Sequence, residues 1–398
     1  MKLKTLSVAM ILATIPMTGA FAAAMDRTGQ SISAFLQPGN YAEAGLSVLD
    51  ADVSGKDIAG NNTGDMAASY HSASAALKIQ ATDKISVGLL FDQPFGAKAQ
   101  YNSDNHIFAT QTPTGREGTS AEVTTENLTL LVGFQPNANW NFYAGPVWQT
   151  VEADIKLRGA AYSLLSGYNI KVDQEEAYGW LAGFAYQIPG IALKAAVTYR
   201  SEIKHNANSL ETSDLPTKAE ALKDTPYLTA EQKYAFPLLG ELAGKVNATT
   251  PQSVNIDLQT GIAKNTLAFA NIRWVHWDQF TVSPILLGKL KQDLISYTDD
   301  QWSANVGVGH KLPDKWSATT AVGFDSGAGN PVTTLGPTEG YWSLGLGAQY
   351  SPAANYFIQA GVKHLWLGDA HAQTGGNIVA EFEDNNAWAY GMKIGYRF

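Results

Sequence analysis

The last eleven residues, Trp388–Phe398, alternate strictly between two kinds of side chain. On a strand, one face would carry Trp388, Tyr390, Met392, Ile394, Tyr396 and Phe398. The other face would carry Ala387, Ala389, Gly391, Lys393, Gly395 and Arg397. Aromatic ends on an apolar face, opposite tiny or cationic residues, are typical of a strand between lipid and a lumen. An edge strand of a soluble sheet is the alternative that this segment alone leaves open.

The amino-terminal segment predicts export. Lys2 and Lys4 precede the apolar run Leu6–Met17, and small residues follow in Thr18–Ala24. This is the pattern of a secretory signal peptide over residues 1–24. No later run reaches the roughly 18 apolar residues that a membrane-spanning helix needs. We therefore expect a protein of the outer membrane of a Gram-negative bacterium that crosses the membrane without helices.

About fourteen alternating segments follow, separated in turn by tight turns and by longer polar connections. Their ranges are 40–50, 70–80, 85–92, 121–135, 141–155, 172–188, 191–205, 253–263, 266–277, 301–311, 316–325, 341–350, 356–367 and 386–398. Short turns alternating with long connections are typical of barrels whose termini both lie in the periplasm. The sequence predicts an all-β fold: a transmembrane antiparallel β-barrel of about 14 strands over residues 40–398.

The long connection 206–251 interrupts this rhythm with two stretches of helical spacing, 218–223 and 230–244. Large apolar residues inside a polar loop need a partner. We expect an extracellular site for an apolar substrate, formed by Tyr234, Phe236, Leu238, Leu239 and Leu242. A surface cap that merely packs on its neighbours is the alternative.

Several segments together resemble the FadL/TodX family of outer-membrane long-chain fatty acid and hydrocarbon transporters. They are Asn40–Gly55, Phe91-Asp-Gln-Pro-Phe-Gly96 with Tyr101, Thr250–Val254, Thr266–Trp277, Leu335–Gly340 and Leu367–Asp369. The resemblance spans about Asn40 to Phe398. It implies a fourteen-stranded barrel, an amino-terminal plug, a hydrophobic site under the extracellular loops and sideways exit near the third strand.

The chain departs from that family before the first strand. Only residues 25–39 are available for a plug, and they lack the family's Asn-Pro-Ala motif. Two interpretations stay open. Either this segment is a minimal plug with Ile32, Phe35 and Leu36 as its apolar contacts, or the lumen is more open than usual.

A substrate carboxylate would need a cation in the lumen, and Arg273 is the first candidate, before Lys363. Alternation places Arg273 on an inward face with Leu267, Phe269, Asn271 and Val275. We include Phe269 among the expected substrate contacts. A salt bridge from Arg273 to Asp257 is the alternative.

The third strand ends in Phe91-Asp-Gln-Pro-Phe-Gly96, where Pro94 offers no amide donor and Gly96 relaxes the backbone. A break in a barrel wall is costly in lipid unless it lines a cavity. We expect a lateral opening between Gly88 and Gly96, with residues 25–39 beneath it. Alternatively, Pro94 only starts an extracellular loop.

The predicted function is passive uptake of hydrophobic compounds, namely long-chain fatty acids or related hydrocarbons. The alternative is a general diffusion porin for small polar solutes, because alternating charges would line a pore. These charges are Glu152, Asp154, Lys194, Arg200, Arg273, Lys363, Lys393 and Arg397. A porin gains nothing from apolar loop helices, whereas a carrier of lipidic solutes must desolvate them.

The remaining expectations concern partners and chemistry. We expect a monomer in contact with outer-membrane lipid and lipopolysaccharide, inserted by machinery that reads Phe398. Without the signal peptide, 25 cations face 36 acids, which argues against nucleic acid. The chain has no cysteine, and none of the common catalytic, phosphate-binding or metal-binding motifs occurs around His276, His310 or His364. No enzyme, cofactor or metal is expected.

Overall fold

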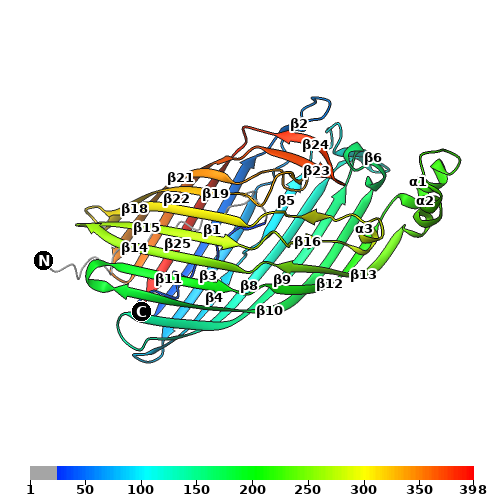
Figure 1. The fold of residues 1–398 in the computed structure, drawn as a ribbon. Helices are drawn as coiled ribbons and strands as arrows, with labels where there is room; N and C mark the ends of the chain where they lie inside the picture. Colours follow the sequence, from blue (N-terminus) through cyan, green and yellow to red (C-terminus); the bar gives the residue numbers. More distant parts are fainter. Residues whose placement is uncertain (1–24) are drawn as a thin grey trace.

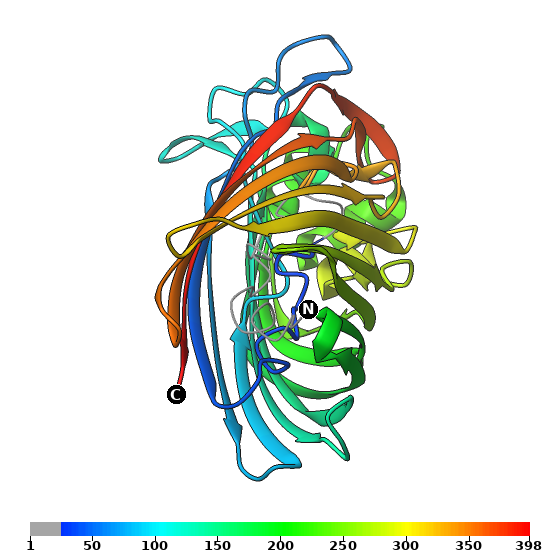
Figure 2. The same cartoon turned by 90° about the vertical axis from the view of Figure 1, so that its left-hand side faces the viewer.

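The computed structural model describes residues 25–398, so the expected signal peptide lies outside them. The chain forms a closed antiparallel barrel of 14 wall strands (Figures 1 and 2). The wall consists of β1 (Tyr41–Asp52), β3 (Tyr70–Gln80), β4 (Ile85–Asp92) continued by β5 (Gly96–Gln100), β8 (Ser120–Phe134), β9 (Trp140–Leu157), β10 (Tyr168–Ile188), β11 (Leu193–Arg200) continued by β12 (Ile203–Thr212), β13 (Glu241–Thr250) continued by β14 (Ser253–Ala263), β15 (Thr266–Val275), β18 (Gln301–Lys311), β19 (Trp316–Asp325), β21 (Tyr341–Ala353), β22 (Tyr356–Leu367) and β25 (Asn386–Arg397). The ring closes because β1 pairs with β3 on one side and with β25 on the other, where Tyr41 faces Arg397. The predicted fold class is confirmed.

Alternation along the strands separates a lipid face from a lumen face. In β25, Trp388 and Tyr390 are exposed while Ala387 and Ala389 are buried. Aromatic pairs gather at both ends of the outer face, such as Trp140 and Phe142 near the short turns, and Phe324 and Trp342 near the long loops. These belts match the two membrane interfaces. No helix within residues 25–398 is long and apolar enough to cross a membrane.

Small elements collect at the long-loop end of the barrel, opposite the end that holds Tyr41 and Arg397 (Figure 1). They are β2 (Gly55–Asp57), β6 (Ala109–Thr112), β7 (Gly115–Gly118), η2 (Ala160–Leu165), α1 (Leu215–Leu222), α2 (Ala230–Ala235), η4 (Phe236–Leu238), β16 (Thr281–Val282), α3 (Ile285–Lys289), β17 (Ile295–Ser296), β20 (Val332–Thr333), β23 (Ala370–Thr374) and β24 (Asn377–Phe382). The tight turn after β10 contains η3 (Pro189–Ile191).

Much of the connection 206–251, which we expected to be a loop, is β-strand. Strands β12 and β13 pair along their whole length and, with β9 and β10, extend beyond the rest of the wall (Figure 1). Only the middle of the connection is helical, as α1, α2 and η4. The sequence hid these strands because the buried positions of β12 include His205, Ala207 and Ser209, so the apolar alternation is weak.

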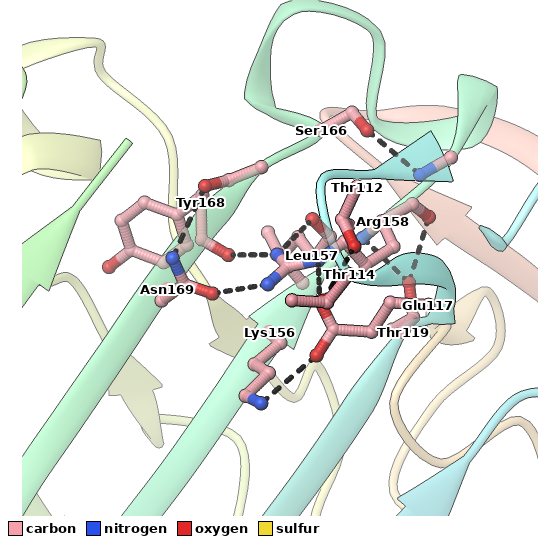
Figure 3. Close-up of polar contacts among 12 residues, drawn as sticks. Thr112, Thr114, Glu117, Thr119, Lys156, Leu157, Arg158, Ser166, Tyr168 and Asn169 are labelled. Atoms are coloured by element: carbon pink, nitrogen blue, oxygen red, sulfur yellow. Dashed lines mark hydrogen bonds and ion pairs between the residues drawn. The ribbon is translucent and has the colours of Figure 1, made fainter. Parts of the chain in front are cut away.

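An ion-pair network holds the β6–β7 hairpin on the rim of the barrel (Figure 3). Glu117 in β7 accepts hydrogen bonds from Arg158 Nε at 2.8 Å and from Lys156 Nζ at 3.0 Å. Arg158 also donates to the carbonyl oxygens of Leu157 and Tyr168. The hairpin is thereby attached to the ends of both β9 and β10.

Candidate functional site

Residues 25–39, which we call the hatch, lie inside the barrel (blue in Figure 2). Ile32, Phe35 and Leu36 are buried against the inner face of the wall, and Phe35 meets Tyr143 edge-to-face at 5.7 Å. Two wall lysines hold the lower end of the hatch: Lys78 Nζ donates to the Gln37 carbonyl at 2.6 Å, and Lys194 Nζ to the Leu36 carbonyl at 2.8 Å. The structure thus places this short segment inside the barrel. That it works as a plug stays a prediction.

A cavity of about 220 Å³ lies between the hatch and the wall. Its lining is rich in charge. The charged lining residues are Asp26, Glu43, Asp92, Arg200, Asp257, Arg273, Asp325, Lys363 and Lys393. Both cations predicted to meet a substrate carboxylate therefore share one space, whereas Phe269 lies outside that lining, buried against Gly307.

Arg273 projects into the lumen, as alternation predicted, but its partner differs from the expected one. Its Nε lies 2.5 Å from Oδ2 of Asp26 in the hatch, and both side chains are buried. Nη1 donates to Ser253 and Asn255, and Nη2 donates to Oε1 of Gln30 at 3.0 Å. Asp257, the expected partner, instead accepts from Asn271. The hatch is thus held to the wall by a buried charge pair.

Lys363 is buried in the cavity wall yet forms no ion pair within 4.0 Å among residues 25–398. A nearby cation, Lys393, is paired with Glu43 at 2.9 Å. Asp325 lines the same cavity, but no carboxylate of residues 25–398 lies within ion-pair distance of Lys363. A buried ammonium so placed can accept a further anionic partner. Of the two cations expected to meet a substrate carboxylate, Arg273 is ion-paired within the described residues and Lys363 is not. Their role toward a substrate stays a prediction.

The wall is interrupted beside the third strand. β4 pairs with β3 only from Ser86 to Phe91, and β5 then pairs with β8 alone. The chain just before β3 meets β5 again at the Ala67–Ala99 bridge, beside the hydrogen bond from Gln100 N to the Met66 carbonyl. In between, the Gln93 side chain accepts from the Ala73 amide at 3.0 Å in place of a backbone partner.

The interval expected for the opening, Gly88–Gly96, was therefore too long. Gly88 is paired on both sides, opposite Lys78 and Leu131, and its lack of a side chain makes room for Phe35 of the hatch. Pro94 and Gly96 do lie in the interruption, where β3 offers them no partner. Their backbone groups bond inward to the hatch, with Arg27 N donating to the Pro94 carbonyl and Gly96 N to the Met25 carbonyl.

The apolar residues of the helical loop separate into two groups. Phe236 and Leu239 are buried in a large cluster under the loops, and Leu242 packs against it. Tyr234 is 81% exposed and Leu238 is 66% exposed. The five residues therefore do not line one pocket, and the expectation of a shared site is corrected to a buried layer with an exposed apolar surface above it.

The three histidines considered for catalysis lie apart and have separate partners. His276 contacts Asp300 at 3.0 Å and Asp278 at 3.3 Å on the rim. His310 bonds Thr266, and His364 lies between Trp366 and Trp388.

Sequence reasoning missed the hatch residues that touch the site, Asp26, Arg27 and Gln30. A signal was present, because Asp26 and Arg27 are the only charged residues between positions 25 and 39. Charges confined to one end of a segment that enters a lumen need partners there.

Comparison with known proteins agrees with this arrangement. Residues 20–398 match the family described as outer membrane protein transport protein (OMPP1/FadL/TodX). The long-chain fatty acid transport protein of Salmonella typhi is 22% identical over 308 residues, covering 71% of this chain and 68% of that protein. A Pseudomonas aeruginosa FadL homologue superposes with a TM-score of 0.74 at 16% identity, covering 97% and 99% of the two chains. The Pseudomonas putida toluene transporter TodX gives 0.62 at 13%, covering 92% and 91%.

The chain therefore belongs to the OMPP1/FadL/TodX family of outer-membrane transport proteins.

Proposed function

We propose that this protein takes up hydrophobic compounds across the outer membrane, with long-chain fatty acids as the first substrate class and related hydrocarbons as the second. Two of the relatives named above are described as a long-chain fatty acid transport protein and a toluene transporter. The observation that carries the proposal is the interrupted wall beside a lumen that the hatch occupies. Because an aqueous solute gains nothing from an opening toward lipid, this arrangement suits an apolar one.

The proposed route has three stages. Tyr234 and Leu238, exposed above the barrel, collect the solute from the outside. Its acid group then meets Lys363 in the polar cavity. The apolar chain leaves through the interruption between β3 and the Gln93–Gly96 segment into the membrane.

The porin alternative is less well supported. A diffusion pore needs a continuous aqueous channel, whereas the hatch side chains Ile32 and Phe35 pack against the wall with almost no exposed surface. The charges expected to line such a pore are largely engaged, as in the pairs Arg273–Asp26 and Lys393–Glu43.

Uptake into cells that lack their own fatty acid transporter tests the proposal. Cells expressing this chain should accumulate labelled oleate and toluene, and should gain nothing for a labelled disaccharide. Passage of the disaccharide without uptake of either hydrophobic compound would favour the porin instead.

A further inference from the structure

A second cavity, of about 320 Å³, lies at the short-turn end of the barrel, the end marked C in Figure 1. Three wall residues, Lys78, Lys194 and Asn141, line it together with residues at or near the short turns. The short turns of such barrels face the periplasm. We propose that this cavity is a periplasm-facing binding site for a doubly charged oxyanion, namely phosphate or a small phosphate monoester. The site is separate from the proposed uptake of hydrophobic compounds.

Two lysines supply the positive charge of the cavity. Lys78 on β3 is buried, and Lys194 on β11 is half-buried. Their ammonium groups donate to carbonyl oxygens of two consecutive residues, Lys78 to Gln37 at 2.6 Å and Lys194 to Leu36 at 2.8 Å. The two charges are therefore close neighbours. Each ammonium has three N–H donors, so donors remain for a ligand.

The positive charge of the cavity is not neutralised by the protein. No carboxylate within residues 25–398 lies within 4.0 Å of either ammonium. Asp83 lines the cavity but is exposed at a turn, and Asp257 accepts a hydrogen bond from Asn271. Arg397 adds another cation at this end, because its Nη2 donates to Gln37 Oε1 at 3.4 Å. Cations gathered away from water favour an anionic partner.

Asn141 indicates a missing ligand independently of the charges. Its side chain is only 8% exposed and lines the same cavity. Oδ1 is buried without a hydrogen-bond partner, and no residue among 25–398 accepts from the amide nitrogen. Buried amide groups are normally hydrogen-bonded, and either end of the group can be turned toward a ligand. An oxyanion in the cavity would accept from this amide as well as from the lysines.

The number of charges and donors defines the class of anion. A phosphate monoester carries about −1.5 to −2 charge at pH 7 and accepts hydrogen bonds through three oxygens. It can therefore neutralise both lysines and still accept from Asn141. A monocarboxylate would neutralise only one of them. A volume of about 320 Å³ lies at the lower end of the range for small-molecule sites, so a small ester fits as well as the free ion.

The lining also separates this site from any site for a transported hydrocarbon. Leu36, Pro38 and Ala185 are the apolar members of the lining, and its other members are polar, charged or glycine. An acyl chain gains little from such surroundings. The cavity therefore favours a small polar anion that arrives from the periplasm over a fatty acid.

Calorimetry on the purified protein in phosphate-free buffer and a non-ionic detergent tests the site. Inorganic phosphate and glycerol 3-phosphate should bind at one site per chain, and acetate should bind about tenfold more weakly or not at all. Lys78→Gln and Lys194→Gln should each weaken phosphate binding about tenfold or more, since each removes a charge-assisted hydrogen bond. Lys315→Gln is the matched control, because Lys315 is an exposed lysine of another short turn, outside the cavity lining.

Asn141→Asp tests the site without removing a lysine. A carboxylate at position 141 has nearly the shape of the amide and would supply the missing negative charge from within the protein. Phosphate binding should then fall about tenfold or more. This variant decides the question if K78Q or K194Q fails to insert, and heat-dependent migration on gels reports insertion of each variant.

Three results would overturn the anion site. They are absence of phosphate binding to the parent protein, equal affinity for acetate and phosphate, and phosphate affinity that K78Q, K194Q and N141D leave unchanged. Tighter binding of glycerol 3-phosphate than of phosphate would identify an ester as the ligand, and the reverse order would identify the free ion. None of these results bears on uptake of oleate or toluene, so the anion site and the proposed function can fail separately.

Discussion

Phe35 of the hatch is seated over Gly88 of β4, so closely that a Cβ atom at position 88 would overlap the Phe35 ring. Gly133 on β8 completes the recess, with a Cβ there lying 2.9 Å from Phe35 Cζ. The position of the hatch therefore depends on two wall glycines, Gly88 and Gly133, as much as on its own apolar residues.

Gly88→Ala should displace Phe35 and loosen the hatch, with an overpacking cost of about 1–3 kcal/mol. The expected readout is faster proteolysis within residues 25–39 and higher conductance in planar bilayers. Gly309→Ala is the control, because a Cβ there meets nothing closer than 3.6 Å. If G88A and G309A behave alike, the recess does not hold the hatch.

Lys363→Gln should weaken oleate binding about tenfold, equivalent to about 1.4 kcal/mol, because the cavity loses its unpaired cation. Binding of oleyl alcohol should stay the same, and Lys363→Arg should retain oleate affinity. Calorimetry on the purified protein measures all three. Equal loss for the acid and the alcohol would show that Lys363 serves packing rather than recognition of a carboxylate.

The exposed and buried halves of the helical loop should respond differently to substitution. Tyr234→Ser with Leu238→Ser should slow uptake at low substrate concentration without changing thermal stability, since both side chains are exposed. Phe236→Ser with Leu239→Ser should destabilise the loop region by several kcal/mol, because both are buried. Normal uptake by the exposed pair of variants would remove these residues from the capture step.

Closing the interrupted wall should block transport. Cysteines at Ala73 and Gln93, joined by a short bis-maleimide, would bridge the two edges where the Gln93 amide now bonds the Ala73 backbone. Uptake of toluene and oleate should fall about tenfold or more if the exit is lateral. The matched control joins Ala76 and Leu90, which already face each other in continuous sheet. Unimpaired uptake after linking 73 to 93 would place the exit elsewhere.

The β6–β7 hairpin should lose its anchor in acid. Burial alone would raise the pKa of Glu117, but hydrogen bonds and ion pairs with Arg158 and Lys156 outweigh burial and lower that pKa below its ordinary 4.5. A carboxyl whose folded pKa is lowered stabilises the fold above its unfolded pKa, and that contribution disappears as pH falls through the folded pKa. Protease cleavage within residues 109–118 should therefore accelerate below about pH 4.5 in the parent protein. Glu117→Gln should show fast cleavage already at pH 7 and little pH dependence.

Much of the wall could be predicted because lipid imposes a strict rule on alternate residues. The ranges expected for β3, β4, β14, β18, β19 and β22 coincide with the observed ones. Strands β12 and β13 were missed because they pair above the membrane, where His205 or Ser209 can fill buried positions. Strict alternation of apolar residues is required only where a strand faces the hydrocarbon core of the membrane.

Within the site, the alternation of side chains along the strand predicted that Arg273 faces the lumen. The same alternation could not predict its ion-pair partner. Asp26 lies 247 positions away in a segment without alternation. The position of such a segment depends on recesses in the barrel wall, such as the one at Gly88. Several strands form each recess together, so it exists only once the wall is assembled. Pro94 lies in the interruption, and its part in an exit stays a prediction. Gly88 lies in continuous pairing instead, because a glycine can serve a close contact as well as a break.

The pairing of β1 with β25 makes assembly a process with a late final step. Arg397 donates to Gln37, 360 positions earlier in the chain, and the two residues meet only when the last strand arrives. Until then two strand edges stand unpaired, and lipid cannot satisfy their amides and carbonyls. Closure of the barrel between β1 and β25 therefore also adds a contact to the lower end of the hatch, which Lys78 and Lys194 hold from other strands.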